Sequence, residues 1–276
     1  MRDKVTLSEK CIELANHVVD DPDEPAAPAG DGEFSKAFQI AANMLRIGAE
    51  ETYRSLETLL KRTPAIRDAF AIDTDDMPDS SSVCKWYQDL LMEVWRLFLC
   101  HSAEVAGISG RAAIDSTFFE RKQSSQYYLQ RSERSVKTIK ATTLTDTESL
   151  AVLDVHCCIE REHDTKAGPQ VVRVTADDLR AVAADTGFQD WKSKFEFYAL
   201  GVDPLILERG SKPQTVGHNA LIQDAGYTQR WMAETSYSAV KHSLGSAVRA
   251  RFWYRQFREI VLMFAVNNTK KITEKL

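Results

Sequence analysis

The segment from Tyr227 to Lys241 (YTQRWMAETSYSAVK) holds charged residues at spacings that could serve a chemical site. If the segment is helical, Arg230 lies one turn before Glu234 and Lys241 lies two turns after it, so they share roughly one face. Glu234 could simply pair with Arg230 on a solvated surface, which would contribute only about 0.3–0.5 kcal/mol. It could also be held by its neighbours for a chemical task. The rest of the chain has to decide between these interpretations.

Two aspartates stand in unusual settings earlier in the chain. Asp115 lies within AAIDSTFF (112–119), a run of small and apolar residues typical of a strand. A charge in such a strand is unfavourable unless something compensates it, although a strand edge could expose it to solvent. Asp185 ends the short apolar run AVAAD and precedes Thr-Gly, where it could also cap a helix that opens at Gly187. Together with Glu234, these residues make a set of three carboxylates.

Three carboxylates have a definite chemistry if they meet. Carboxylate oxygens are hard ligands suited to Mg²⁺ or Mn²⁺. Two such ions about 3.5–4 Å apart can activate a nucleophile and stabilise the leaving oxygen of an in-line phosphoryl displacement. The set therefore favours phosphoryl transfer, provided that the fold brings the three acids together.

The first 105 residues are predicted to be helical. Apolar residues recur at three- and four-residue spacing, and Pro, Asp and Gly gather in the linker DDPDEPAAPAGDGE. The expected elements are a helix over about 7–18 capped by Ser8, the linker 20–33, a helix over 35–61 with an interruption at Gly48, a break at Pro64, and a helix capped within Ser80–Ser82 that continues past Phe98.

From Gly107 onward the pattern changes to alternating strands and helices. The order is three strands, helix, strand, helix, strand, helix, helix. The expected strands are 112–119, 136–145, 149–159, 181–185 and 202–207, and the expected helices are 175–180, 187–200, 228–244 and 246–266. This order places Asp115 on the first strand, Asp185 after a later strand, and Glu234 on a following helix.

With these elements the chain resembles the DDE transposases of bacterial and archaeal insertion sequences. That family carries Tyr, two residues, Arg, three residues, Glu, six residues and Lys, which the segment 227–241 matches at all four positions. DSTFF is similar to the family's first-Asp strand, and DTGFQD (185–190) is similar to its second-Asp motif. Phe188 stands where the family more often has Tyr. The resemblance covers about residues 107–268.

The resemblance implies a fold and a metal site. The expected class is α/β, with an RNase H-like mixed sheet flanked by helices over 107–276, preceded by an all-helical region over 1–106 that could recognise terminal repeats. Asp115, Asp185 and Glu234 are the implied catalytic residues and ligands of two Mg²⁺ or Mn²⁺ ions. Asp115 would bridge both ions, and each of the other two acids would bind one.

The resemblance also implies a reaction and a partner. The protein is expected to bind the terminal inverted repeats of double-stranded DNA, as a homodimer on DNA. Water would nick the transposon end, and the freed 3′-OH would attack target DNA. The residues expected to contact DNA are Tyr227, Arg230, Lys241, Arg249, Arg251 and Arg255.

Three other interpretations remain open at this point. An RNase H-like nuclease or resolvase would cut DNA without joining it. A DNA-binding relic of a transposase would have lost catalysis, although all three acids are present. The motifs could also be coincidental in an unrelated α/β domain.

The charge distribution and the composition limit which partners and which cellular compartment we expect for the protein. The net charge is −5, yet residues 227–276 hold nine Lys or Arg against three Asp or Glu. Residues 121–140 hold six basic residues against one acid. An acidic body with two basic segments is a pattern that a phosphate backbone could use. The longest apolar run is far too short for a membrane span, and the N-terminus lacks a signal-peptide core, so we expect a cytoplasmic, nucleoid-associated prokaryotic protein with no membrane partner.

Five cysteines, an odd number, argue against a disulfide framework. His156, Cys157, Cys158 and His163 lie close together in the sequence. Their spacing matches none of the usual zinc-ligand patterns, so the sequence does not predict a zinc site there.

Overall fold

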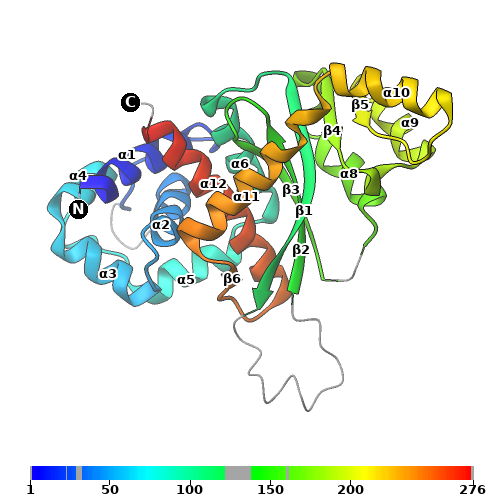
Figure 1. Ribbon diagram of the computed structural model, residues 1–276. Coiled ribbons are helices and arrows are strands. Elements are labelled where there is room, and N and C mark those ends of the chain that lie inside the picture. The colour runs from blue at the N-terminus through cyan, green and yellow to red at the C-terminus, as the bar shows by residue number, and fades with distance from the viewer. Residues whose placement is uncertain (1, 23, 29–32, 122–137, 160–161, 275–276) are drawn as a thin grey trace, which may run out of the picture. The chain divides into compact units, whose positions relative to one another are not determined.

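The computed structural model describes all residues except 1, 23, 29–32, 122–137, 160–161 and 275–276 (Figure 1). The chain divides into two compact units: residues 1–105 with 261–276, and residues 106–260. The sequence pattern assigns 261–276 to the catalytic domain, whereas this segment groups with the N-terminal helices. Val266 lies against Gly48, and Asn268 Nδ2 donates a 3.1 Å hydrogen bond to Ser102 Oγ.

The first unit is built from helices whose apolar faces meet, which confirms its predicted helical character. Helix α1 packs on α2 and α4, and α5 packs on α2 and α3. Phe38, Leu45 and Phe70 are among the buried core side chains. The helices are α1 (Arg2–Asn16), α2 (Lys36–Gly48), α3 (Tyr53–Arg62), α4 (Pro64–Phe70), α5 (Ser80–Asp89), α6 (Met92–Ala106) and the C-terminal part of α12 (Trp253–Glu274).

Several local details of this unit differ from the sequence pattern. Ser8 lies inside α1 and bonds to backbone carbonyls of the preceding turn, so it is not a cap. The expected interruption of the helix 35–61 at Gly48 is confirmed, because α2 ends at Gly48 and the chain turns there, with Glu50 at a φ of 57°, before α3 begins. Pro64 opens α4 rather than only ending a helix, since the first helical position needs no N–H. Asp79, not the serines that follow it, caps α5.

The described residues of the second unit contain one six-stranded sheet. Its strands are β1 (Arg111–Arg121), β2 (Thr138–Asp146), β3 (Val152–Cys158), β4 (Ala181–Ala184), β5 (Asp203–Ile206) and β6 (Ala247–Val248). The order is β3-β2-β1-β4-β5, with β6 paired to the last residues of β1. β1, β2 and β3 are antiparallel, whereas β4 and β5 run parallel to β1. This mixed sheet with flanking helices confirms the predicted RNase H-like class.

Helices connect and cover the strands of this sheet. α11 packs on β1 and β2, and α8 packs on β2, β3 and α9 (Figure 1). The helical elements are α8 (Asp164–Val172), η1 (Ala176–Asp178), η2 (Thr186–Phe188), α9 (Trp191–Ala199), α10 (Pro213–Asp224), η3 (Tyr227–Arg230) and α11 (Trp231–Leu244), followed by the start of α12.

Four of these elements correct the sequence pattern. The expected helix 187–200 is interrupted, because Asp190 separates η2 from α9. The expected helix 246–266 begins with the short strand β6 before α12 starts at Trp253. α8 and α10 had no predicted counterpart. None of the helices in the described parts of the chain combines the length and apolar character needed to cross a membrane.

Candidate active site

The strand register brings the two aspartates to the same level of the sheet. β1 and β4 are parallel neighbours, and Ile114 pairs with Ala184. Asp115 directly follows Ile114, and Asp185 directly follows Ala184. Adjacent strands lie about 4.8 Å apart, so two acids separated by 69 residues in the sequence become neighbours.

The segment that carries the third acid is fixed against the same strands. η3 lies against β1 and β4. Gly226 precedes it at a φ of 109°, and a Cβ there would lie 2.6 Å from Arg111 Nη1, so only glycine suits this position. Arg111 at the start of β1 donates a 2.7 Å hydrogen bond to the carbonyl of Ala225. Glu234 follows in the first turn of α11.

Arg230 links the acid on the helix to the acid on the strand. Its Nη1 lies 3.4 Å from Asp115 Oδ2, and its Nη2 lies 3.0 Å from Glu234 Oε1. The Asp115 side chain is 20% exposed and that of Glu234 is 47% exposed. The pair on α11 is therefore more than a solvated i,i+4 contact, because the same guanidinium also serves a largely buried carboxylate.

The electrostatics of this contact are those of acids gathered around one cation. Burial raises the pKa of Asp115, and the hydrogen bonds from the Ser116 N–H and Tyr237 together with the charge of Arg230 offset only part of that rise. Burial by itself would lower the pKa of Arg230, yet Asp115 and Glu234 outweigh it and raise that pKa above its usual value. Asp185 also contributes to the field at Arg230.

Tyr237 is a contact that the sequence interpretation missed. Its hydroxyl donates a 3.1 Å hydrogen bond to Asp115 Oδ2. Burial, and then the charge of Asp115, raise its pKa well above the ordinary range of a tyrosine. The signal was available, since Tyr237 lies three residues after Glu234 on the helix face that the signature defines.

Asp185 is the least engaged of the three acids. It is exposed, and its Oδ1 accepts a 2.7 Å hydrogen bond from the N–H of Thr186 as the cap of η2. Asp185 is therefore a cap, as the sequence allowed, but it caps the short 3-10 helix η2 and not a longer helix that opens at Gly187. Although all three acids are described, their oxygens do not all lie within 4.8 Å of one another.

The donor set nevertheless suits hard divalent cations. Three carboxylates offer oxygen ligands, and a guanidinium already lies between two of them as a positive charge. Among the described residues, the cation that pairs with the Asp115 side chain is this shared guanidinium. The residues present therefore fit Mg²⁺ or Mn²⁺ by charge and by ligand type.

The residues predicted to contact DNA lie in two places. Tyr227 is half-buried beside Arg230, and burial raises its pKa. Lys241 Nζ donates a 2.5 Å hydrogen bond to Thr117 Oγ1, two residues past Asp115 on β1, and burial lowers the pKa of Lys241. Both therefore belong to the neighbourhood of the acids.

The other three follow β6. Arg249 and Arg251 are exposed, and Arg255 lies 5.0 Å above the ring of Phe252. Phe252 and Trp253 are each more than half exposed, which gives this segment an accessible aromatic surface among basic residues. Most of the basic segment 121–140 lies outside the described residues.

A fourth carboxylate shows what a structural acid looks like in the same sheet. Asp146 is fully buried at the end of β2. Its Oδ2 accepts from the backbone and hydroxyl of Ser109, and its Oδ1 accepts from the backbone of Glu148 and from both groups of Ser149. Every bond lies between 2.7 and 3.0 Å. Asp146 is saturated by donors, whereas Asp115 shares one cation with another acid.

The comparison with known families supports the importance of these elements. Residues 108–268 match the family model described as a transposase DDE domain. The match covers more than half of the chain and includes Asp115, Asp185 and the whole segment 227–241. A search among curated proteins found no match.

Proposed function

Because the chain belongs to the transposase DDE domain family, we propose that it cleaves the ends of a DNA element at terminal inverted repeats and joins each freed 3′-OH to target DNA. One observation carries the proposal: Asp115 and Asp185 follow paired residues of adjacent parallel strands, and Arg230 joins Asp115 to Glu234. Three acids from distant parts of the sequence thus surround one region of positive charge.

The metal site follows from this arrangement. Asp115, Asp185 and Glu234 would hold two Mg²⁺ or Mn²⁺ ions. When bound, such ions activate the attacking oxygen and stabilise the leaving oxygen of an in-line phosphoryl displacement. The half-exposed Glu234 and the exposed Asp185 leave the site open to a large substrate.

Arg230 and Lys241 would bind the DNA backbone near the reacting phosphate. Arg230 shares its guanidinium between two carboxylates, and its planar fork could bind a phosphate with two hydrogen bonds once those carboxylates have other partners. Tyr237 remains on Asp115 and keeps that carboxylate oriented. Lys241 lies beside β1 and adds a second positive charge on the same side of Asp115.

The segment after β6 would extend this DNA contact. Ala247 pairs with Glu120, five residues past Asp115, which is about 17 Å along the strand. From there Arg249, Arg251 and Arg255 would bind phosphates, and the exposed rings of Phe252 and Trp253 would stack on bases. Repeat recognition by the N-terminal helices and action as a homodimer on DNA complete the proposal.

A strand-transfer assay tests this function. Purified protein would be combined with Mg²⁺ or Mn²⁺, a labelled duplex carrying the element's inverted repeat, and a plasmid target, at low and high salt. Glu234→Gln removes one proposed ligand charge, and Asp224→Asn removes a charge from the exposed end of α10 as the matched control. We expect joined product with the wild type and Asp224→Asn, and none with Glu234→Gln.

The other outcomes separate the alternatives. Nicking without joining would replace the proposal with a nuclease. Repeat-specific binding without either reaction would indicate a DNA-binding relic, and joining that persists in Glu234→Gln would remove Glu234 from the site.

A further inference from the structure

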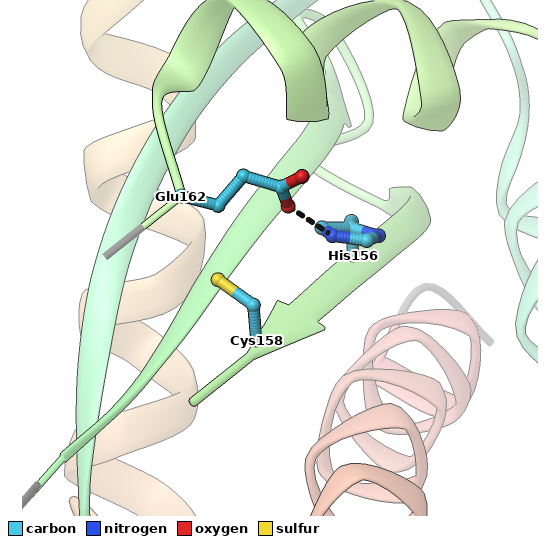
Figure 2. A group of neighbouring side chains, drawn as sticks. All are labelled: His156, Cys158 and Glu162. Atoms are coloured by element: carbon cyan, nitrogen blue, oxygen red, sulfur yellow. Dashed lines mark hydrogen bonds and ion pairs between the residues drawn. The ribbon is translucent and has the colours of Figure 1, made fainter. Parts of the chain in front are cut away.

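The end of β3 and the segment before α8 bring together three side chains that the proposed reaction does not use. His156, Cys158 and Glu162 each offer a ligand atom, and these atoms all lie within 4.8 Å of one another. His156 Nε2 and Glu162 Oε2 are 2.8 Å apart. Figure 2 shows the three side chains pointing toward one another, two from the strand and one from the segment that precedes the helix.

We propose that His156, Cys158 and Glu162 bind a thiophilic divalent cation, Zn²⁺ in particular, at a site separate from the three catalytic carboxylates. Imidazole, thiolate and carboxylate are the three ligand types that Zn²⁺ takes in proteins. Three protein ligands leave a fourth tetrahedral position for water. Binding displaces the proton of the Cys158 thiol, which passes to solvent.

Strand geometry explains why these residues converge and their neighbours do not. His156 and Cys158 are two residues apart on β3, so their side chains leave the same face, and the side chain of Cys157 leaves the other. His163 is exposed and bonds to Thr165 through its Nδ1. The sequence pattern lacked Glu162, which completes the set from beyond the strand.

The ligand spacing is close to what a bound ion needs. Ligand bonds of about 2.0–2.3 Å set tetrahedral ligand atoms roughly 3.3–3.7 Å apart. The His156–Glu162 contact at 2.8 Å would open slightly, and the longest separation, no more than 4.8 Å, would close by about an ångström. Rotations of the three side chains, of which His156 and Glu162 are each only half-buried, can supply both changes.

Neighbouring charges permit a cation here. Lys140 pairs with Cys158 across the strands, so its ammonium lies on this face. That charge is already matched, because Lys140 Nζ lies 2.7 Å from Asp164 Oδ1 and 2.7 Å from the carbonyl of Glu162. Glu162 keeps its carboxylate for the ion.

Occupancy would fix the start of α8 against the sheet. Asp164, two residues after Glu162, accepts a 2.7 Å hydrogen bond from Ser116 Oγ, and Ser116 follows the catalytic Asp115. A metal that crosslinks β3 to this segment would therefore hold Asp164 on β1. The inferred role is structural, and the family membership does not assign it.

Metal binding can be measured without any DNA. The full chain would be stripped with a chelator and titrated with Co²⁺, whose thiolate ligation gives a charge-transfer absorption band, and then with Zn²⁺ to displace it. By mass spectrometry of the metal we expect the wild type to hold one Zn²⁺ per chain more than Cys158→Ser does, and we expect a higher Tm with Zn²⁺. Cys158→Ser should abolish the band, and Cys157→Ser should keep it.

Two further variants keep the test decisive. Glu162→Gln leaves strand β3 intact, and it should weaken Zn²⁺ binding by more than the roughly 10–100-fold that loss of an outer-sphere partner produces. His163→Gln is its matched control and should bind as the wild type does. Absence of a thiolate band, or a band that survives Cys158→Ser and disappears in Cys157→Ser, would overturn the proposal. Strand transfer by the same preparation is scored independently.

Discussion

Two groups of candidate metal ligands in the second unit differ in how complete they are without a cation. Asp115, Asp185 and Glu234 come from three elements far apart in the sequence, and their oxygens do not all lie within 4.8 Å. The ligand atoms of His156, Cys158 and Glu162 do all lie within 4.8 Å of one another, and these three residues come from one short stretch of the chain.

The difference follows from charge. Three carboxylates repel one another, and Arg230 is the cation that the structure places between two of them. Burial raises the pKa of the Cys158 thiol, so the thiol is neutral at pH 7 and can approach Glu162 without a metal. The ligand atoms of an all-carboxylate site can therefore stay apart until a cation binds. The ligand atoms of a site with a neutral thiol can lie close together before a cation binds.

Asp115→Asn should give the largest effect and separate the two groups. The amide keeps the size of the side chain but removes the anionic ligand, so DNA cleavage should fall by at least on the order of 10²–10³-fold. The same variant should keep the Co²⁺–thiolate band at full intensity. Cleavage kinetics and absorption spectra measure the two effects, with Asp224→Asn as control. Cleavage within tenfold of the wild type would remove Asp115 from the site.

Asp146→Ala should act on stability alone. The change leaves five part-buried donors of Ser109, Glu148 and Ser149 without the buried carboxylate that accepts from them. We expect the free energy of unfolding to fall by about 3 kcal/mol, measured by urea denaturation. Asp177→Ala, an exposed acid in η1, is the control and should change little. A stable Asp146→Ala protein would show that saturation by donors does not mark a structural acid.

The sequence predicted the elements whose residues repeat an apolar pattern. β1 begins with a run of small and apolar residues, β4 is a short buried run, and α11 carries most of a four-position signature, so Asp115, Asp185 and Glu234 could be located before the fold was known. Their assignment as metal ligands stays a prediction. The strand register that brings the two aspartates level is a property of tertiary pairing and could not be read from either strand alone.

The elements that were missed lack such a pattern. α10 buries none of its described residues, so it has no apolar stripe to detect. α8 contains Pro169 in its interior, which usually argues against a helix. Glu162 was missed because it lies outside the usual zinc spacings and reaches His156 only through the fold.

Arg230→Gln tests whether one cation joins two of the proposed catalytic acids. The neutral amide removes the shared partner of Asp115 and Glu234 and the proposed phosphate contact, so cleavage should fall roughly 10–100-fold. Loss of this positive charge should also raise the pKa of Asp115 further. The rate of steady-state cleavage over a series of Mn²⁺ concentrations measures the fall in activity. Arg173→Gln, an exposed change, is the control, and equal rates for the two variants would contradict the assignment.

Tyr237→Phe should have the smallest effect and a pH-dependent one. The Tyr237 hydroxyl stabilises the charged form of Asp115, so its loss raises the pKa of that carboxyl above a value that burial has already raised. Asp115 must be ionised to bind a cation, and the acid-side loss of cleavage should therefore move to higher pH. We expect roughly a three- to tenfold deficit on the acid side of the profile, which disappears as the pH rises and Asp115 is ionised in both proteins.

The pH profile of cleavage at subsaturating Mn²⁺ distinguishes this role from packing. Tyr198→Phe alters a mostly exposed tyrosine on α9 and should leave the profile unchanged. A deficit of Tyr237→Phe that is the same at every pH would mean that the ring, not the hydroxyl, matters at Asp115. A deficit confined to low pH would instead show that the Tyr237 hydroxyl sets the protonation of Asp115. A packing defect would lower cleavage at every pH, because it does not depend on whether that carboxyl is ionised.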